Sequence, residues 1–284
     1  MNATKKLGWL LGAALGGVVT MMAAAGPAVA GTVTVKGSDT MVILGQRWAE
    51  EFMKKHPGVT LQVTGGGSGT GISALINGTT DVCQSSRAMS APEKDKLRER
   101  YSTTGVEIPV ARDGLEIFVN ASSPLSEISM AALKLIFTGK VTNWKEIGGP
   151  DARIIVYSRE NSSGTYVFFK EHVLQNADYT PRAQSMSGTA AVVNAVSKEK
   201  FGIGYGGAGY AKGIKVLKVK KDDASPGVLP ELANVQSGTY PLSRPLFFYL
   251  RNPPAGDVKS FVDWVLSAEG QQVVTKVGYF PLNK

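Results

Sequence analysis

Cysteine and histidine are nearly missing from this sequence of 284 residues, which holds one Cys and two His. The single Cys83 cannot form a disulfide within the chain, so the fold must depend on its hydrophobic core, which this length permits. His56 and His172 lie far apart and give no metal-ligand spacing with the lone Cys. Both stand at predicted helix ends, which argues against a Ser–His catalytic pair. We therefore expect no metal, no cofactor and no catalytic residues.

Long runs of one charge are also missing, although the chain is basic overall. Its formal net charge is +8, but Lys and Arg alternate with acids, as in residues 93–96 and 198–200. Nucleic-acid-binding proteins gather basic residues into a patch or run, so we do not expect a nucleic acid as a partner. A mildly basic protein does attract small anions through long-range electrostatics.

Charge is absent from residues 7–25, which follow Lys5 and Lys6 and precede the small residues Ala28 and Ala30. A basic start, an apolar segment and a small-x-small pattern are typical of a secretory signal peptide. Residues 1–30 are therefore predicted to be removed on export, and a retained membrane anchor is the alternative. After residue 30, no segment approaches the ~20 apolar residues of a membrane-spanning helix.

Strand-like and helix-like segments alternate along the remaining chain, which predicts an α/β fold. The expected strands cover residues 32–36, 60–64, 81–85, 106–110, 115–119, 154–158, 202–206, 215–219 and 245–250. The expected helices cover residues 41–55, a segment ending at about 77, and then 92–101, 129–138, 162–173, 189–198 and 257–266. Ser90 and Glu93 predict a capping box at one helix start. The polar, Pro-containing stretch 221–238 is expected to be a loop.

Three segments share a strand end, a turn rich in Ser, Thr and Gly, and a helix start. They are 37–40 with Ser38, Asp39 and Thr40, 65–71 with Ser68 and Gly69, and 159–165 with Arg159, Ser163, Gly164 and Thr165. A helix start carries partial positive charge and backbone N–H groups without partners, so it is a potential anion site. One such start alone indicates ordinary capping. Three that converge would surround a small oxyanion.

Arg159 strengthens this interpretation, because a planar guanidinium matches a tetrahedral oxyanion. The alternative is that Arg159 is a surface charge paired with Glu160 or another acid. Other glycine-rich sites do not fit the spacing of residues 65–71. Thr70 stands where a dinucleotide fingerprint needs its third Gly and where a hydrolase elbow needs its second, and the turn lacks the Lys of a P-loop.

These segments, together with residues 81–87, 137–144, 202–205 and 240–246, resemble the phosphate-binding proteins of bacterial phosphate ABC importers, the PstS-like family. The resemblance covers almost the whole chain after residue 30. It implies a periplasmic-binding-protein fold of type II, with 31–115 and 246–284 in one lobe and 116–245 in the other. The crossings between lobes are expected at 115–119 and 245–250. It also implies a periplasmic monomer, not an enzyme, that captures inorganic phosphate and delivers it to the membrane permease of an ABC importer.

The resemblance places the phosphate contacts on the residues already singled out in the three loops. One position departs from the family, because many relatives carry there an Asp that accepts the proton of phosphate, whereas this chain has Ser86, followed by Arg87. Ser86 is the weaker acceptor, so selectivity against sulfate is less secure unless Asp39 or Asp113 substitutes. Arg87 is expected to add positive charge to the cleft, and the alternative is that it pairs with an acid.

Three other functions stay open from the sequence. The loop 159–165 also resembles loops of tungstate binders, so tungstate, molybdate or sulfate are alternative ligands. A secreted phosphatase is a further alternative, against which the scarcity of His and the missing metal spacing argue. A phosphate sensor without a permease partner is the third.

Overall fold

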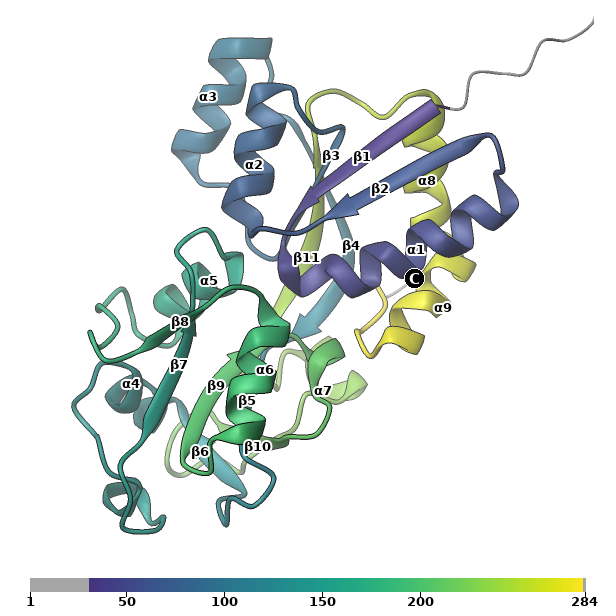
Figure 1. The fold of residues 1–284 in the computed structure, drawn as a ribbon. Helices are drawn as coiled ribbons and strands as arrows, with labels where there is room; N and C mark the ends of the chain where they lie inside the picture. Colours follow the sequence, from purple (N-terminus) through teal and green to yellow (C-terminus); the bar gives the residue numbers. More distant parts are fainter. Residues whose placement is uncertain (1–30, 283–284) are drawn as a thin grey trace, which may run out of the picture.

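The computed structural model describes residues 31–282 and folds them into two lobes, each built on one β-sheet (Figure 1). The predicted signal peptide, residues 1–30, lies outside the described residues. Within the described part of the chain, no helix has the length and apolar character needed to cross a membrane. The predicted α/β class and the two-lobed arrangement are confirmed.

The first lobe contains a five-stranded sheet in the order β2-β1-β3-β11-β4. Its strands are β1 (Gly31–Gly37), β2 (Val59–Thr64), β3 (Val82–Ser85), β4 (Val106–Gly114) and β11 (Ser243–Leu250). Its helices are α1 (Val42–Lys55), α2 (Ser68–Asn77), α3 (Ala91–Tyr101), α8 (Gly256–Leu266) and α9 (Ala268–Val277). Strand β1 runs parallel to β2 and β3, whereas β11 runs antiparallel to β3 and β4. Trp48, Phe52 and Phe261 are fully buried in the core of this lobe.

The second lobe contains a six-stranded sheet in the order β6-β10-β5-β9-β7-β8. Its strands are β5 (Glu116–Val119), β6 (Glu127–Ser129), β7 (Ile155–Arg159), β8 (Gln184–Met186), β9 (Gly202–Gly206) and β10 (Lys215–Lys220). Its helices are α4 (Met130–Phe137), α5 (Gly164–His172), α6 (Thr189–Lys198) and α7 (Leu232–Ser237), with the 3₁₀ turns η2 (Trp144–Ile147) and η3 (Ala208–Tyr210). Its core is aromatic, and the rings of Phe169 and Tyr205 stack with centroids 4.1 Å apart.

The chain passes between the lobes twice, at two neighbouring places. Leu115 separates the end of β4 from the start of β5, and Leu242 precedes β11. The N–H of Leu115 donates to the carbonyl of Leu242 at 3.0 Å, so the two crossings lie side by side. Ser243 pairs with Gly114 in the first sheet. The division of the chain into lobes at 115/116 and 245/246 stays a prediction. Residues 243–245, which that division gives to the second lobe, pair with β4 of the first sheet.

Most predicted elements form where the local pattern predicted them. The helix expected over 189–198 coincides with α6, and the capping box of Ser90 and Glu93 forms at the start of α3. The loop prediction for 221–238 is wrong in part, because α7 lies within it. Val235 of α7 is fully buried in the second core, and that burial stabilises a helix that its own sequence does not signal. Helix α9 and the three-residue strands β6 and β8 were not predicted.

Candidate functional site

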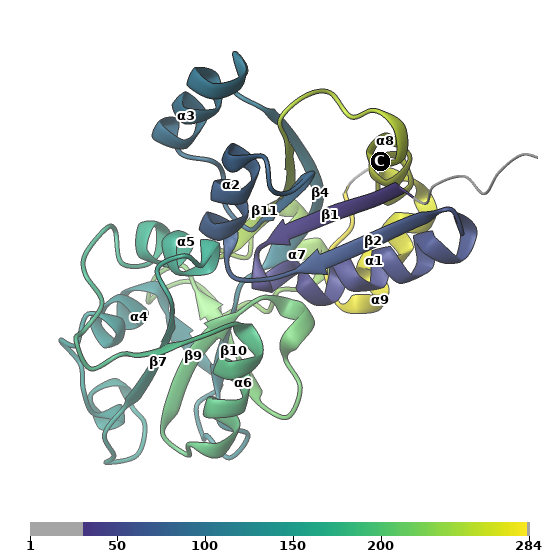
Figure 2. The same cartoon turned by 45° about the horizontal axis from the view of Figure 1, so that its top comes forward.

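The three predicted loops meet at the junction of the two lobes, where three helices begin (Figure 2). The 3₁₀ turn η1 (Asp39–Met41) follows β1 and leads into α1, whereas α2 begins after β2 and α5 begins after β7. A backbone hydrogen bond of 2.9 Å, from the N–H of Gly69 to the carbonyl of Ser162, joins the starts of α2 and α5 across the junction. The hydroxyls of Thr40 and Thr165 lie 2.8 Å apart and bring η1 to the same junction, so the three starts lie close together.

Three serines of the first lobe form a hydroxyl cluster at this junction. The Oγ of Ser86 lies 2.9 Å from the Oγ of Ser38 and 3.4 Å from the Oγ of Ser68. The backbone N–H of Ser86 also donates to the Oγ of Ser68 at 3.1 Å. Each serine follows a different strand, β1, β2 or β3, and these parallel strands end at the same edge of the sheet. All three are at most 1% exposed, so the cluster is sealed from water.

The start of α5 lies directly against this cluster. A Cβ atom at Gly164 would stand 2.3 Å from the Oγ of Ser68 and 2.8 Å from the Oγ of Ser86, so only glycine permits this approach. The hydroxyl of Ser163 instead accepts a hydrogen bond from the N–H of Tyr166 at 3.3 Å, which caps α5. Of these two predicted residues, Gly164 faces the serines, while the side chain of Ser163 is used within its own helix.

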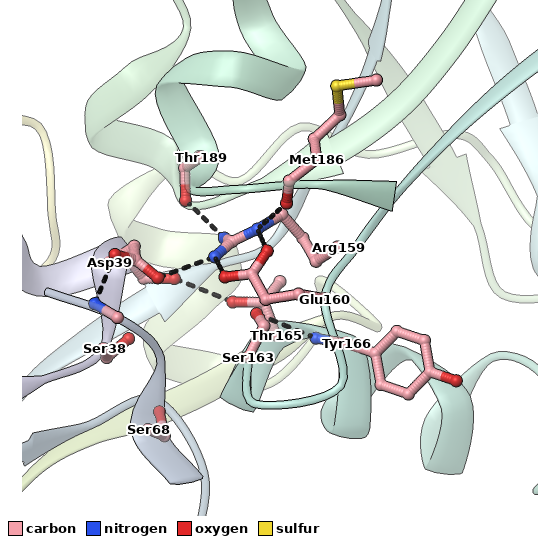
Figure 3. Close-up of polar contacts among 12 residues, drawn as sticks. Ser38, Asp39, Ser68, Arg159, Glu160, Ser163, Thr165, Tyr166, Met186 and Thr189 are labelled. Carbon is pink, nitrogen blue, oxygen red and sulfur yellow. Dashed lines mark hydrogen bonds and ion pairs between the residues drawn. The ribbon is translucent and has the colours of Figure 1, made fainter. Parts of the chain in front are cut away.

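The guanidinium of Arg159 bridges the two lobes and is only 1% exposed (Figure 3). Its Nη2 donates at 2.8 Å to Asp39 of the first lobe and at 2.8 Å to Glu160. Its Nε is shared between Glu160 and the carbonyl of Met186, and its Nη1 donates to the hydroxyl of Thr189 at 2.9 Å. These contacts account for the Nε hydrogen, both Nη2 hydrogens and one Nη1 hydrogen. The pairing with Glu160 that the sequence left open is present, but at a buried position.

The positive charge of Arg159 is balanced by two carboxylates. Burial disfavours ionised Glu160, but the hydrogen bond and charge of Arg159 outweigh it and hold the pKa of Glu160 below its usual value. The other oxygen of Asp39, Oδ1, accepts a hydrogen bond from the N–H of Gly66 at 2.9 Å. Both oxygens of Asp39 therefore already have donors, and this carboxylate lies between the loops that carry Ser38 and Ser68.

Arg87 also pairs with an acid, which is the alternative that the sequence left open for this residue. Its Nη1 and Nη2 donate to Glu93 at 2.8 and 2.7 Å in a bidentate arrangement. Burial works against the charged form of Glu93, but the bond to Arg87 prevails and lowers the pKa of Glu93. The charge that Arg87 was expected to add to the cleft is thus compensated. Among residues 31–282, no group of His, Cys, Asp and Glu gathers that would hold a metal.

Sequence reasoning assigned no role to Arg244, although it lies within the segment 240–246. Its Nε and Nη2 donate to Asp113 at 3.0 and 2.8 Å, its Nη1 donates to the carbonyl of Ser86 at 3.1 Å, and its Nη2 donates to the hydroxyl of Thr165 at 3.0 Å. The same hydroxyl of Thr165 lies 2.8 Å from that of Thr40. Asp113, considered as a substitute acceptor at the site, is instead the ion-pair partner of Arg244. No local pattern signals this group, because Arg244 stands 79 residues from Thr165 and 131 from Asp113.

Comparison with known proteins decides the family. The model of the PBP superfamily domain matches residues 22–269. A Pseudomonas aeruginosa protein named phosphate-binding protein PstS is 35% identical over 271 residues, with 89% of this chain and 84% of that protein covered. The chain belongs to the PstS family. A Bacillus subtilis PstS is 34% identical, with 89% of this chain and 81% of that protein covered.

Solved structures of PstS-like proteins share the fold of this PstS-family chain. A Clostridium perfringens protein, assigned as a phosphate ABC transporter substrate-binding protein and solved with bound phosphate, superposes with a TM-score of 0.81 at 30% identity. The comparison covers 89% of this chain and 100% of that one. A phosphate transport receptor from Vibrio cholerae gives a TM-score of 0.70 at 28% identity, covering 88% of this chain and 100% of the receptor. The fold is therefore the type II periplasmic-binding-protein fold that the sequence predicted.

Proposed function

We propose that this chain captures inorganic phosphate between its two lobes and delivers it to the membrane permease of an ABC importer. Family membership supports the proposal, because the P. aeruginosa and B. subtilis relatives are named as phosphate-binding proteins and the C. perfringens structure holds phosphate. The PstS family consists of binding proteins rather than enzymes, so the chain performs capture and release with no catalytic step.

One observation of the structure carries the proposal, namely that hydroxyls and helix starts from both lobes gather around one buried point. The first lobe contributes the hydroxyls of Ser38, Ser68 and Ser86 to this point, and the second lobe contributes Gly164 and Thr165 at the start of α5. Short O–H and N–H donors around a helix start are the groups that replace the hydration shell of an oxyanion. We take the phosphate contacts to be Ser38, Asp39, Thr40, Ser68, Gly69, Ser86, Arg87, Arg159, Ser163, Gly164 and Thr165.

Closure of the lobes is the central step of the proposed mechanism. Ser38, Ser68 and Thr165 are at most 1% exposed, so phosphate reaches them only when the lobes move apart. The neighbouring crossings at Leu115 and Leu242 give the hinge for this movement. Phosphate first meets the serines of the first lobe, and the start of α5 then closes over it.

Titration calorimetry on protein freed of ligand tests the proposal. Phosphate is expected to bind with a dissociation constant of about 1 μM or tighter, which corresponds to about −8 kcal/mol. Sulfate, tungstate and molybdate are expected to bind at least about tenfold more weakly. Tighter binding of any of these three would overturn the choice of phosphate. Turnover of a chromogenic phosphomonoester would overturn the non-enzymatic assignment.

The cellular setting of this function is also a proposal. We infer an extracytoplasmic location, with residues 1–30 acting as a cleaved signal peptide, and we infer that one chain is the working unit. Mass spectrometry of the exported protein would give the new N-terminus. Sedimentation with and without phosphate would give the mass of the particle, and a dimer in both conditions would contradict the second inference.

A further inference from the structure

Arg244 lies at the hinge, two residues after the second crossing of the chain at Leu242. It belongs to β11 of the first sheet and is only 3% exposed. Its contacts nevertheless reach both lobes. Within the first lobe its Nη1 donates to the carbonyl of Ser86, the residue at the centre of the serine cluster. Across the junction its Nη2 donates to the hydroxyl of Thr165, and its guanidinium lies over the ring of Phe168, 5.0 Å from the centroid.

The charge of Arg244 is compensated by a carboxylate that is itself tied to both lobes. Oδ2 of Asp113 accepts from Nε and Nη2 of Arg244 at 3.0 and 2.8 Å. Oδ1 of Asp113 accepts from the N–H of Ala208 in the second lobe at 3.1 Å. Asp113 is fully buried, so this ion pair is kept out of water. Because the charge of this guanidinium is compensated, it attracts a bound anion only weakly. Its contribution to the site is therefore the fixed direction of its hydrogen bonds.

A guanidinium is suited to such a geometric role. Its planar fork holds five N–H donors at fixed angles, whereas a Lys ammonium is a compact point charge on a flexible stem. Arg244 donates to three separate acceptors, which are Asp113, the carbonyl of Ser86 and the hydroxyl of Thr165. The hydroxyl of Thr165 is within reach only when the lobes are closed. Contacts that exist in one of two states shift the equilibrium toward that state.

We propose that Arg244 is a positioning residue of the phosphate site, which holds Thr165 against Ser86 in the closed form and thereby slows the release of phosphate. This inference rests on the proposed function, since it concerns the same site. It assigns no direct contact with phosphate to Arg244.

The experiment removes the ion pair as a unit, because deleting one member would leave a buried charge without a partner. Asp113→Asn/Arg244→Gln is compared with the wild-type protein. Arg251→Gln serves as the matched control, because Arg251 follows the other end of β11 and donates to backbone carbonyls of Leu75 and Thr80. Phosphate affinity is measured by calorimetry, phosphate release by stopped flow, and folding by thermal melting.

The double variant is expected to bind phosphate at least about tenfold more weakly than the wild type, mainly through faster release. Thr165→Val is expected to weaken binding in both backgrounds, but by a smaller factor in the double variant, because there its contact with Arg244 is already lost. Arg244→Lys keeps a charge for Asp113 but not the fork, so it is expected to release phosphate faster as well. Arg251→Gln is expected to change melting without changing affinity.

Several outcomes would overturn the inference. Unchanged affinity and release in a folded double variant would do so, as would an additive effect of Thr165→Val. If the double variant does not fold, Arg244→Lys decides, and wild-type release from that variant contradicts the positioning role. If the wild-type protein does not bind phosphate, the proposed function itself is wrong. This outcome is distinguishable from a failure of the positioning role, in which the wild type binds and the Arg244 variants behave like it.

Discussion

The two halves of the site use different chemistry. The first lobe offers three neutral hydroxyls, of which that of Ser86 contacts those of Ser38 and Ser68. The second lobe offers the start of α5 and a guanidinium, Arg159, whose donors are largely taken by Asp39 and Glu160. The contrast indicates that neutral hydroxyls line the first half of the site, while Arg159 of the second half also ties the two lobes together through Asp39. Sequence reasoning gave Arg159 the leading role at the anion, and its contacts now make that role a testable alternative.

The largest effect on phosphate affinity is expected from Gly164→Ala, which keeps the two halves apart. The added Cβ would stand 2.3 Å from the Oγ of Ser68 and 2.9 Å from its Cβ, so the lobes could not close fully. Phosphate affinity should fall about 100-fold, or about 2.7 kcal/mol. Gly58→Ala is the matched control, because a Cβ there meets no atom within 4 Å, and it should bind as the wild type does. Equal affinity for both variants would refute the close approach.

Arg159→Ala addresses the charged half and is expected to weaken phosphate binding about 30-fold, or about 2 kcal/mol, while the fold survives. If Arg159 acts chiefly by pairing with the carboxylates, Asp39 is left as an uncompensated negative charge beside the anion. Arg159→Ala/Asp39→Asn should then recover part of the lost affinity. Calorimetry on the three proteins separates the cases, because no recovery would mean that the guanidinium itself binds phosphate.

Glu116 lies at the hinge between the halves, and its titration is expected to couple stability to pH. It is 8% exposed, and its Oε2 has no hydrogen-bond partner among the described residues. Burial, and then the charge of Asp113, raise the pKa of Glu116 from 4.5 to about 8. The folded protein thus holds a proton that the unfolded chain releases. The resulting stabilisation is complete below pH 4.5 and declines as the pH rises to about 8.

The loss should approach about 1.4 kcal/mol per pH unit within that window. Glu116→Gln cannot ionise, so its free energy of unfolding should lack this component. Urea unfolding of both proteins at several pH values between 5 and 8 provides the check. Parallel pH profiles for the two proteins would show that Glu116 is already ionised in the folded state.

The smallest effect is expected from Ser86→Asp, which changes the neutral half. An ionised carboxylate accepts the proton of hydrogen phosphate but repels sulfate, which has no proton to donate at neutral pH. The ratio of phosphate to sulfate affinity should rise about fivefold, measured by competition calorimetry. A ratio that stays constant would indicate that another group already accepts the proton of phosphate.

Those parts of the site that depend on contiguous residues could be predicted from the sequence. Each serine-bearing turn follows a strand and precedes a helix start, and the pattern of contiguous residues indicates this order. The capping box at Ser90 and the extent of α6 are equally local. Such features need no knowledge of how distant segments approach one another.

The rest depends on tertiary contacts between distant residues. Arg159 meets Asp39 across 120 positions, and Arg244 meets Thr165 across 79, so neither pair leaves a local pattern. Whether a guanidinium is free or already paired is decided by these contacts. Helix α7 was missed for the same reason, since burial of Val235 in a core formed by other segments stabilises it.

The position of β11 has a consequence for how the polypeptide acquires its shape during synthesis. This strand, residues 243–250, is inserted between β3 and β4, yet it is made only after the entire second lobe. The sheet of the first lobe therefore lacks the strand between β3 and β4 until β11 has left the ribosome. By then, all strands of the second lobe have been synthesised. A nascent chain halted before residue 243 should accordingly protect the middle lobe from proteolysis and leave the first lobe open to it.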